Sequence, residues 1–150
     1  MNVVYKVFSA KRIVDFIEKR NFENFYFNNG YAYILSREAD EIFIEAHNNT
    51  IMNETAKLVI DVLNNLDECI NKAHSWLNHL NLDDKMFPHA LDKGFEVCGM
   101  YFGKYSYSHD PSPTNGFLIS FSTIEFYPCK FSVKFHSNNM HPFAVEEWVQ

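Results

Sequence analysis

The sequence predicts an α+β fold, in which an antiparallel sheet of about six strands carries one long amphipathic helix on one face, with a short helix near the N-terminus. Segments typical of strands occur in runs instead of alternating strictly with helices, which favours α+β over α/β. Residues 53–80 repeat apolar side chains at steps of three and four, the spacing of a helix that buries one face. The 150 residues contain no linker or internal repeat, so we expect a single domain over 1–150.

The N-terminal segment predicts a short strand followed by a short helix. Residues 3–8 are apolar and begin with β-branched side chains, as strands often do. Between residues 10 and 20, Ile13, Phe16 and Ile17 recur at helical spacing, while most other positions are charged. We therefore expect a strand at 3–8 and an amphipathic helix at 10–20.

Asn29-Gly30 is the clearest local signal in the chain, because it separates two runs rich in Tyr and Phe. A type I′ turn requires positive φ at both central residues, which Asn-Gly tolerates. The pair therefore predicts a hairpin in which Tyr26 lies opposite Tyr33. Residues 41–46 alternate in polarity and are expected to add a third strand. The two faces of that strand would carry Ile42, Ile44 and Ala46 on one side, and Glu41, Phe43 and Glu45 on the other.

Residues 53–80 are expected to form one continuous helix. Asn53 is expected to cap it, and Glu54 lies in the first turn, where the helix dipole favours an acidic residue. Glu68 and Lys72 are placed for an i,i+4 ion pair on the outer face. The buried face would consist of Val59, Leu63, Leu66, Ile70, Ala73, Leu77 and Leu80, widened by Val62, Cys69 and Trp76. A face of this width favours a helix lying on a sheet over a coiled coil.

The last third of the chain predicts strands at residues 94–102, 117–126 and 130–136, after a polar connection at 81–93. Between the first two strands, residues 106–116 are rich in Pro, Ser and Asn and are expected to form a long loop, a kind of segment that often carries function. The third strand alternates apolar residues with polar ones, which predicts a solvent-exposed face formed by Ser132, Lys134 and His136. Residues 142–150 are expected to form a last strand or a short helical turn.

Composition and charge exclude several classes of protein. An aromatic content of 17% is not that of a disordered chain, and a formal charge of −6 disfavours nucleic-acid binding, which needs clustered Lys and Arg. Residues 40–100 hold 11 acidic and 4 basic side chains, so complementary fields would favour a basic partner. The first residues lack the order of a signal peptide, and no stretch approaches the ~18 apolar residues of a membrane span. We therefore expect a cytoplasmic protein that binds no membrane.

No arrangement of residues predicts catalysis, a metal ion or a cofactor. Cys69, Cys98 and Cys129 form no C-x-x-C pair and are expected to be reduced structural thiols. The 7 histidines include no closely spaced pair of metal ligands, and no glycine-rich phosphate loop is present. Residues 108–110 are Ser, His and Asp, but adjacent residues cannot assemble the geometry of a catalytic triad. We therefore expect a protein that is not an enzyme.

The predicted hairpin at 25–35, helix at 53–80 and strands at 117–136 form a recognisable layout in a small, acidic, cysteine-poor chain. This layout resembles that of bacterial immunity proteins, which protect a cell from its own or a sibling's toxin. The resemblance implies a cytoplasmic, non-enzymatic inhibitor that binds a cognate toxin. It further implies that binding covers the active or substrate-binding surface of the toxin.

The candidate partner-binding residues follow from charge and from aromatic content. Carboxylates of the acidic segment would face the basic site of a nuclease-like toxin. Tyrosines beside the predicted loop would act as central anchors, because they offer contact area at low conformational cost. The candidates are Asp40, Glu41, Glu45, Asp83, Asp84, Tyr105 and Tyr107.

Two other functions are compatible with the sequence. The chain could be a small-ligand-binding domain or an enzyme, with a pocket between the sheet and the long helix near residues 106–116. It could also be an oligomeric subunit that uses the tail around Trp148 or a sheet edge as its interface. The sequence favours no particular oligomeric state.

Overall fold

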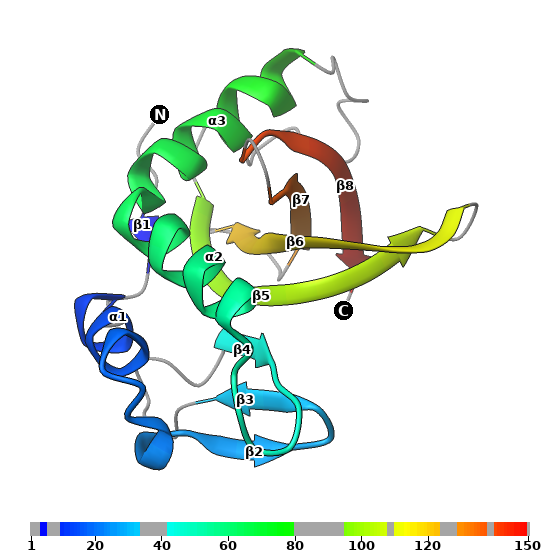
Figure 1. The fold of residues 1–150 in the computed structure, drawn as a ribbon. Coiled ribbons are helices and arrows are strands. Elements are labelled where there is room, and N and C mark those ends of the chain that lie inside the picture. The colour runs from blue at the N-terminus through cyan, green and yellow to red at the C-terminus, as the bar shows by residue number, and fades with distance from the viewer. Residues whose placement is uncertain are drawn as a thin grey trace.

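The helices and strands of this protein are described for residues 4–5, 10–33, 42–79, 95–107, 110–123, 129–137 and 140–149 of a computed structural model. Within these ranges, three α-helices and eight strands form an α+β fold, which confirms the predicted class. Helices α2 (Asn53–Asn64) and α3 (Leu66–His79) lie across one face of a curled sheet, and α1 (Ala10–Glu18) packs beside α2 (Figure 1). None of the described helices is long and apolar enough to cross a membrane.

One sheet contains all of these strands, in the order β2-β3-β4-β5-β6-β7-β8, with β1 paired to β5 outside this path. The strands are β1 (Val4–Tyr5), β2 (Tyr26–Asn28), β3 (Tyr31–Tyr33), β4 (Ile42–Glu45), β5 (Phe95–Tyr107), β6 (Asp110–Thr123), β7 (Cys129–His136) and β8 (Pro142–Val149). Because β6 occupies one edge of β5, β1 and β4 lie one after the other along its second edge. β8 confirms the strand interpretation of the tail. The rest of the predicted strand at 3–8 and the predicted connection at 81–93 lie outside the described residues.

The predicted antiparallel sheet is wrong at two places, because β1 and β4 both run parallel to β5. The chain passes from β4 through α2 and α3 to β5, so the helices form a crossover that returns it in the same direction (Figure 1). A crossover of this kind makes neighbouring strands parallel, whereas a hairpin makes them antiparallel. The other strand pairs are antiparallel as predicted.

The β2–β3 hairpin has the predicted register, with Tyr26 opposite Tyr33. Asn29 and Gly30 have φ angles of 52° and 83°, and a type I′ turn requires both to be positive. β4 pairs antiparallel with β3, which confirms the predicted third strand. Ile42 and Ile44 in β4, and Ala46 just after it, are buried, as the alternation predicted.

The predicted long helix is broken at Asn65, whose backbone leaves the helical region at φ −123° and ψ 30°. Its side-chain amide donates to the carbonyl of Asp61 at 2.8 Å, so it takes the place of a backbone donor there. Asn competes in this way with main-chain hydrogen bonds and is therefore a poor residue for a helix interior. The predicted apolar face is nevertheless buried on both helices, at Val59, Leu63, Leu66, Ile70, Ala73 and Leu77.

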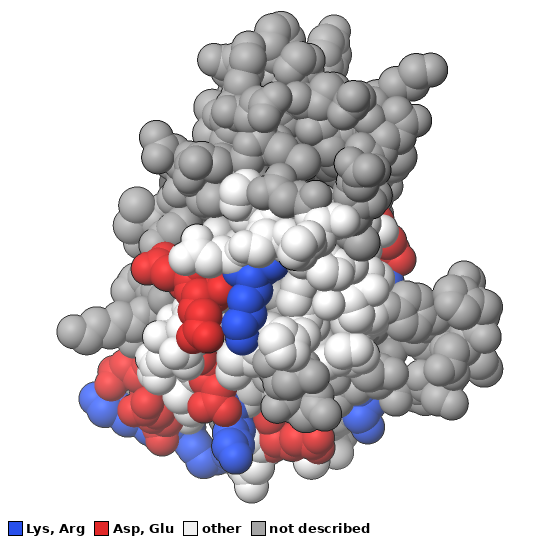
Figure 2. Space-filling view, turned by 90° about the horizontal axis from the view of Figure 1, so that it is seen from above, with Lys and Arg blue, Asp and Glu red and all other residues white. Residues whose placement is uncertain are grey.

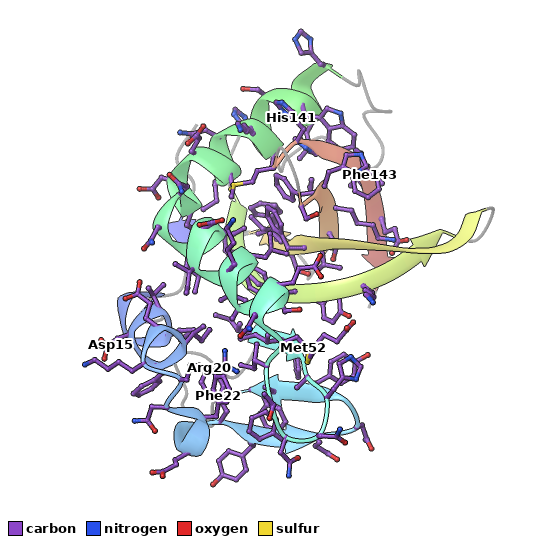
Figure 3. The ribbon with its side chains drawn as sticks, viewed as in Figure 1. Asp15, Arg20, Phe22, Met52, His141 and Phe143 are labelled. Atoms are coloured by element: carbon purple, nitrogen blue, oxygen red, sulfur yellow. The ribbon has the colours of Figure 1, made fainter. Side chains whose placement is uncertain are left out.

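Asn53 does not cap α2, contrary to the prediction, because Met52 holds the N-cap position and Asn53 is the first helical residue. The side-chain oxygen of Asn53 instead accepts a hydrogen bond from the guanidinium of Arg20 at 2.5 Å. Arg20 also lies 4.9 Å from the ring centre of Phe22 and donates to the carbonyl of Ile51 (Figure 3). Arg20 therefore ties the end of α1 to the start of α2.

The predicted loop at 106–116 is wrong, since the described part of it continues β5 and β6 as a long hairpin. β4 pairs with β5 only as far as Phe102, and β7 pairs with β6 only from Gly116 onward, within the described residues. The segment beyond these points is therefore a two-stranded ribbon that projects from the body (Figure 1). Pro111 and Pro113 lie in this ribbon, where an edge strand tolerates a residue that lacks an N–H donor.

The core lies between the helices and the sheet and is centred on stacked phenylalanines. Phe117 on β6 lies 5.9 Å from Phe102 on β5 and 4.5 Å from Phe135 on β7, ring centre to ring centre. The polar face predicted for β7 is not exposed: Ser132 is 1% and Lys134 is 7% exposed. Both have partners, as buried polar groups require. Ser132 shares a hydrogen bond with Ser120, and Lys134 Nζ lies 2.6 Å from a carboxylate oxygen of Glu146.

Replacement of Phe117 by Ala removes the middle ring of this stack. It is expected to lower the free energy of unfolding by about 3–5 kcal/mol, because the neighbouring side chains fill the cavity only in part. Phe43→Ala is the matched control, since the ring of Phe43 is 42% exposed and its loss leaves no cavity. Urea denaturation followed by circular dichroism measures both, and equal losses would contradict this description of the core.

Candidate functional site

The sheet carries a row of aromatic rings on the face that points away from the helices. Alternate residues of β3 and β4 enter the core, so the residues between them point to the opposite face. These rings, with one each from β2 and β5, form what we call the aromatic ladder: Tyr26, Tyr31, Tyr33, Phe43 and Tyr101.

Each ring of the aromatic ladder contacts the next, so the rings form one continuous surface across four strands. The ring centres lie 6.0 Å apart for Tyr26–Tyr33, 6.0 Å for Tyr33–Phe43, 6.5 Å for Phe43–Tyr31 and 5.9 Å for Tyr31–Tyr101. Tyr26, Tyr31 and Phe43 are 54%, 41% and 42% exposed. Single exposed apolar side chains are ordinary on protein surfaces, but a contiguous group of them marks a site of interaction.

The sequence predicts one ring pair of the ladder, Tyr26–Tyr33, but not how far the ladder extends across the sheet. The Asn-Gly turn predicts the Tyr26–Tyr33 pair, and the alternation of β4 places Phe43 opposite to its buried neighbours. Tyr101 joins the ladder because the parallel pairing of β4 with β5 sets it beside Phe43. The usable signal was that Tyr31, Tyr33 and Phe43, which occupy outward positions of β3 and β4, are aromatic, whereas a purely solvated face would carry polar residues there.

Glu45 follows Phe43 on the same face and ends the ladder at the junction of β4 and β5. Its Oε2 accepts the main-chain N–H of Lys104 at 2.8 Å. The hydroxyl of Tyr101 donates to the carbonyl of Lys104 at 3.0 Å and lies 3.5 Å from the same Oε2. Its Oε1 lies 3.3 Å from Nε2 of His47. The carboxylate thus pairs with β5 just beyond the last residue that β4 itself reaches.

Gly103 makes this contact possible. Its φ of +149° lies in a region that favours glycine, and a Cβ added there would stand 2.6 Å from Cβ of Glu45 and 2.7 Å from the hydroxyl of Tyr101. The backbone of β5 can therefore approach Glu45 only because position 103 has no side chain. Burial raises the pKa of Tyr101, and the nearby charge of Glu45 raises it further, so this hydroxyl stays protonated as a donor.

The structure describes the side chain of one predicted site residue, Glu45, which is 18% exposed and bonded within the protein. Tyr105 and Tyr107 lie in β5, on the projecting ribbon, but their side chains are outside the described set. The other four candidates, Asp40, Glu41, Asp83 and Asp84, lie outside the described residues. Their roles stay predictions.

Charged side chains of both signs lie next to one another over the described part of the surface in Figure 2, without separating into one acidic face. Two ion pairs at i,i+4 spacing contribute to this mixing. Lys19 lies 3.1 Å from Asp15 on α1, and Lys72 lies 3.5 Å from Glu68 on α3, as predicted for the second pair. Exposed pairs of this kind contribute little to stability.

An open groove of about 720 Å³ lies on the outer side of α3. Its described lining comes from α3 and the start of β8, namely Glu68, Asn71, Lys72, Ser75, Trp76, His79, His141 and Pro142. His141 and Phe143 lie beside α3 in Figure 3, and the ring of Phe143 stacks on His136 at 4.1 Å. The described lining includes no residue of 106–116, beside which the ligand-binding alternative placed its pocket, so that alternative stays a prediction.

Cys69 is the one cysteine whose side chain is described, and it is 1% exposed on the inner face of α3. Burial raises the pKa of its thiol to about 11, partly offset by the charge of Lys72. A thiol that stays protonated is a poor nucleophile. Cys69 is therefore a packing residue, as predicted.

Comparisons with protein-family models, with curated proteins and with solved structures found no match for this chain.

Replacement of Gly103 by Ala is expected to lower the free energy of unfolding by more than the ~1–2 kcal/mol of an ordinary positive-φ substitution, because the new Cβ meets Glu45 and Tyr101. Gly30→Ala is the matched control: its φ is +83°, but the nearest atom to an added Cβ is 3.9 Å away. Thermal denaturation compares the two variants. If Gly103→Ala lowers stability no more than Gly30→Ala does, the close approach of β5 to Glu45 is contradicted.

Proposed function

We propose that this chain is a non-enzymatic binding protein that neutralises a basic protein partner, such as a bacterial toxin, by covering its active or substrate-binding surface. The observation that carries this proposal is the aromatic ladder, which is continuous, exposed and built on paired strands. Tyr and Phe at the centre of an interface supply much of its binding energy.

The packing of the ladder supports a binding role. Each ring already touches a neighbour, so binding would immobilise little that is not already held. Rings set on strands are also placed more rigidly than rings on loops. A preorganised aromatic surface of this kind suits tight binding to a partner that is itself folded.

Charge favours a basic protein over a nucleic acid as the partner. The chain has a formal charge of −6, so its field would attract a basic surface and repel phosphates. Beside the described rings stand Glu45, His47 and Lys104, which do not make a basic groove. The predicted acidic residues at positions 40 and 41 immediately precede β4 in the sequence and would add to the attraction.

The α3 groove favours a second function, the binding of a small ligand. Its volume of about 720 Å³ is that of a typical ligand site, and Trp76 offers an apolar wall. Lys72 in its described lining is paired with Glu68, so this lysine does not by itself indicate an anionic ligand. A metabolite that raises the melting temperature of the chain, and does so less when Trp76 is replaced by Ala, would favour this function.

Replacement of Phe43 or Tyr31 by Ala is expected to weaken binding of the partner by about 30-fold or more, the effect of losing an interface anchor. Binding is measured by calorimetry between the purified chain and the C-terminal domain of the protein that the adjacent upstream reading frame encodes. Met52→Ala is the matched control, because Met52 is 50% exposed but lies outside the ladder. If the Met52 variant weakens binding as much as the ladder variants, or if no domain binds, the proposal is overturned.

Replacement of Asp40 and Glu41 together by Lys is expected to slow association with a basic partner by about tenfold at low salt and to flatten its salt dependence, while dissociation changes little. Glu45 is left intact, because its loss would also disturb β5. Glu18→Lys with Glu23→Lys changes the net charge equally on exposed positions elsewhere. Stopped-flow rates that respond equally to both double variants would show that net charge, and not this segment, steers the partner.

A further inference from the structure

We propose that the aromatic ladder recognises an arginine side chain of the partner, whose guanidinium lies against Tyr31 and Phe43 and reaches the carboxylate of Glu45. This inference rests on the proposed function and specifies the chemistry of its contact. It assigns to Glu45 a role that goes beyond holding β5.

Three rings of the ladder are neighbours of Glu45 on this face of the sheet. Tyr31 is its cross-strand partner on β3, and Phe43 precedes it by two residues on the same face of β4. The hydroxyl of Tyr101 lies 3.5 Å from its Oε2. Tyr31 and Phe43 meet edge to face at 79°, and both are more than 40% exposed, so their free surfaces border the carboxylate.

The carboxylate has capacity for another donor. Its Oε2 accepts from the N–H of Lys104, while Oε1 has one described partner, His47, at 3.3 Å. An ionised carboxyl group accepts at about four positions, so these contacts leave room for a guanidinium. The side chain of Glu45 is 18% exposed and that of its partner His47 is 61% exposed, so this pair of side chains is in contact with solvent. Lys104 contacts this carboxylate through its main chain, and no ion pair is formed between their side chains within the described residues.

Arginine is the side chain that fits these two features at once. Ring faces carry a negative quadrupole that attracts cations, and the planar guanidinium can stack on a ring while its N–H groups bond a carboxylate. Lysine carries a similar charge but has no planar group to stack on a ring, and an apolar side chain would bring the carboxylate no further donor.

An arginine that combines a ring contact with a hydrogen bond to a side-chain oxygen already exists within the protein. The guanidinium of Arg20 lies 4.9 Å from the ring centre of Phe22 and donates to a side-chain oxygen, that of Asn53 (Figure 3). The ladder offers an equivalent ring and a charged oxygen, with no arginine of the described residues bound to them.

The test is an NMR titration with a short glycine-serine peptide that contains Arg-Gly-Arg, compared with peptides in which citrulline or lysine replaces both arginines. Citrulline keeps the shape of arginine and removes its charge. The ring signals of Tyr31 and Phe43 are expected to shift, with affinity for the citrulline peptide lower by about tenfold or more and for the lysine peptide lower by about threefold or more. Equal affinity for the arginine and citrulline peptides would overturn the inference.

Variants separate the two features of the site. Glu45→Gln keeps an acceptor for Lys104 but removes the charge. It should lower the affinity for the arginine peptide about fivefold and leave the affinity for the citrulline peptide unchanged. Phe43→Leu removes the ring and should lower the affinity for the arginine peptide by a similar factor, whereas Phe43→Tyr keeps a ring and should leave that affinity unchanged. If Met52→Leu also abolishes the difference in affinity between the arginine and citrulline peptides, the ladder is not the site.

These outcomes are distinct from those of the proposed function. If a protein partner binds through the ladder but the peptides are not discriminated, the function stands and the arginine inference fails. If the peptides are discriminated but no toxin domain binds, arginine recognition stands and the toxin proposal fails. If a single-stranded oligonucleotide binds more tightly than the arginine peptide, and Phe43→Leu abolishes that binding, both proposals are overturned in favour of a base-stacking surface.

Discussion

The two-sided pairing of β5 is the constraint on which the rest of the structure depends. β1 and β4 occupy one edge of this strand and β6 occupies the other, so both halves of the chain are joined through it. Buried main-chain donors and acceptors need partners, which forces each edge of a central strand to be covered. Where β4 ends, the carboxylate of Glu45 continues the coverage by accepting the N–H of Lys104. Gly103 is the residue that lets this side chain come close enough.

The two faces of the sheet both carry aromatic rows but differ in burial. One face carries the stacked rings of Phe102, Phe117 and Phe135, which are fully buried under the helices. The other carries a second aromatic row that is exposed on β2, β3 and β4. Because these rings are not part of the buried core, replacing them is expected to cost less stability than replacing the buried phenylalanines. The exposure and continuity of this second row are the reason for proposing a binding role.

Charge and aromatic surface would act at different stages of binding. Long-range attraction between an acidic protein and a basic partner raises the rate of encounter, whereas desolvated rings at the centre of an interface slow dissociation. The acidic segment and the aromatic ladder are therefore complementary rather than competing explanations. Glu45 belongs to both, because it is a carboxylate of the acidic segment that the fold holds among the rings.

The sequence by itself determined the features that depend on near neighbours. The Asn29-Gly30 turn sets the Tyr26–Tyr33 pair, and the helical spacing of apolar residues marks the buried faces of α2 and α3. Tertiary structure alone decided that β4 lies parallel to β5. This pairing brings Tyr101 beside Glu45, 56 positions earlier in the chain, and beside Phe43, and it completes the ladder. The reason is physical: polarity along a strand tells which face of it is buried, but the identity and direction of the neighbouring strand depend on how distant segments pack.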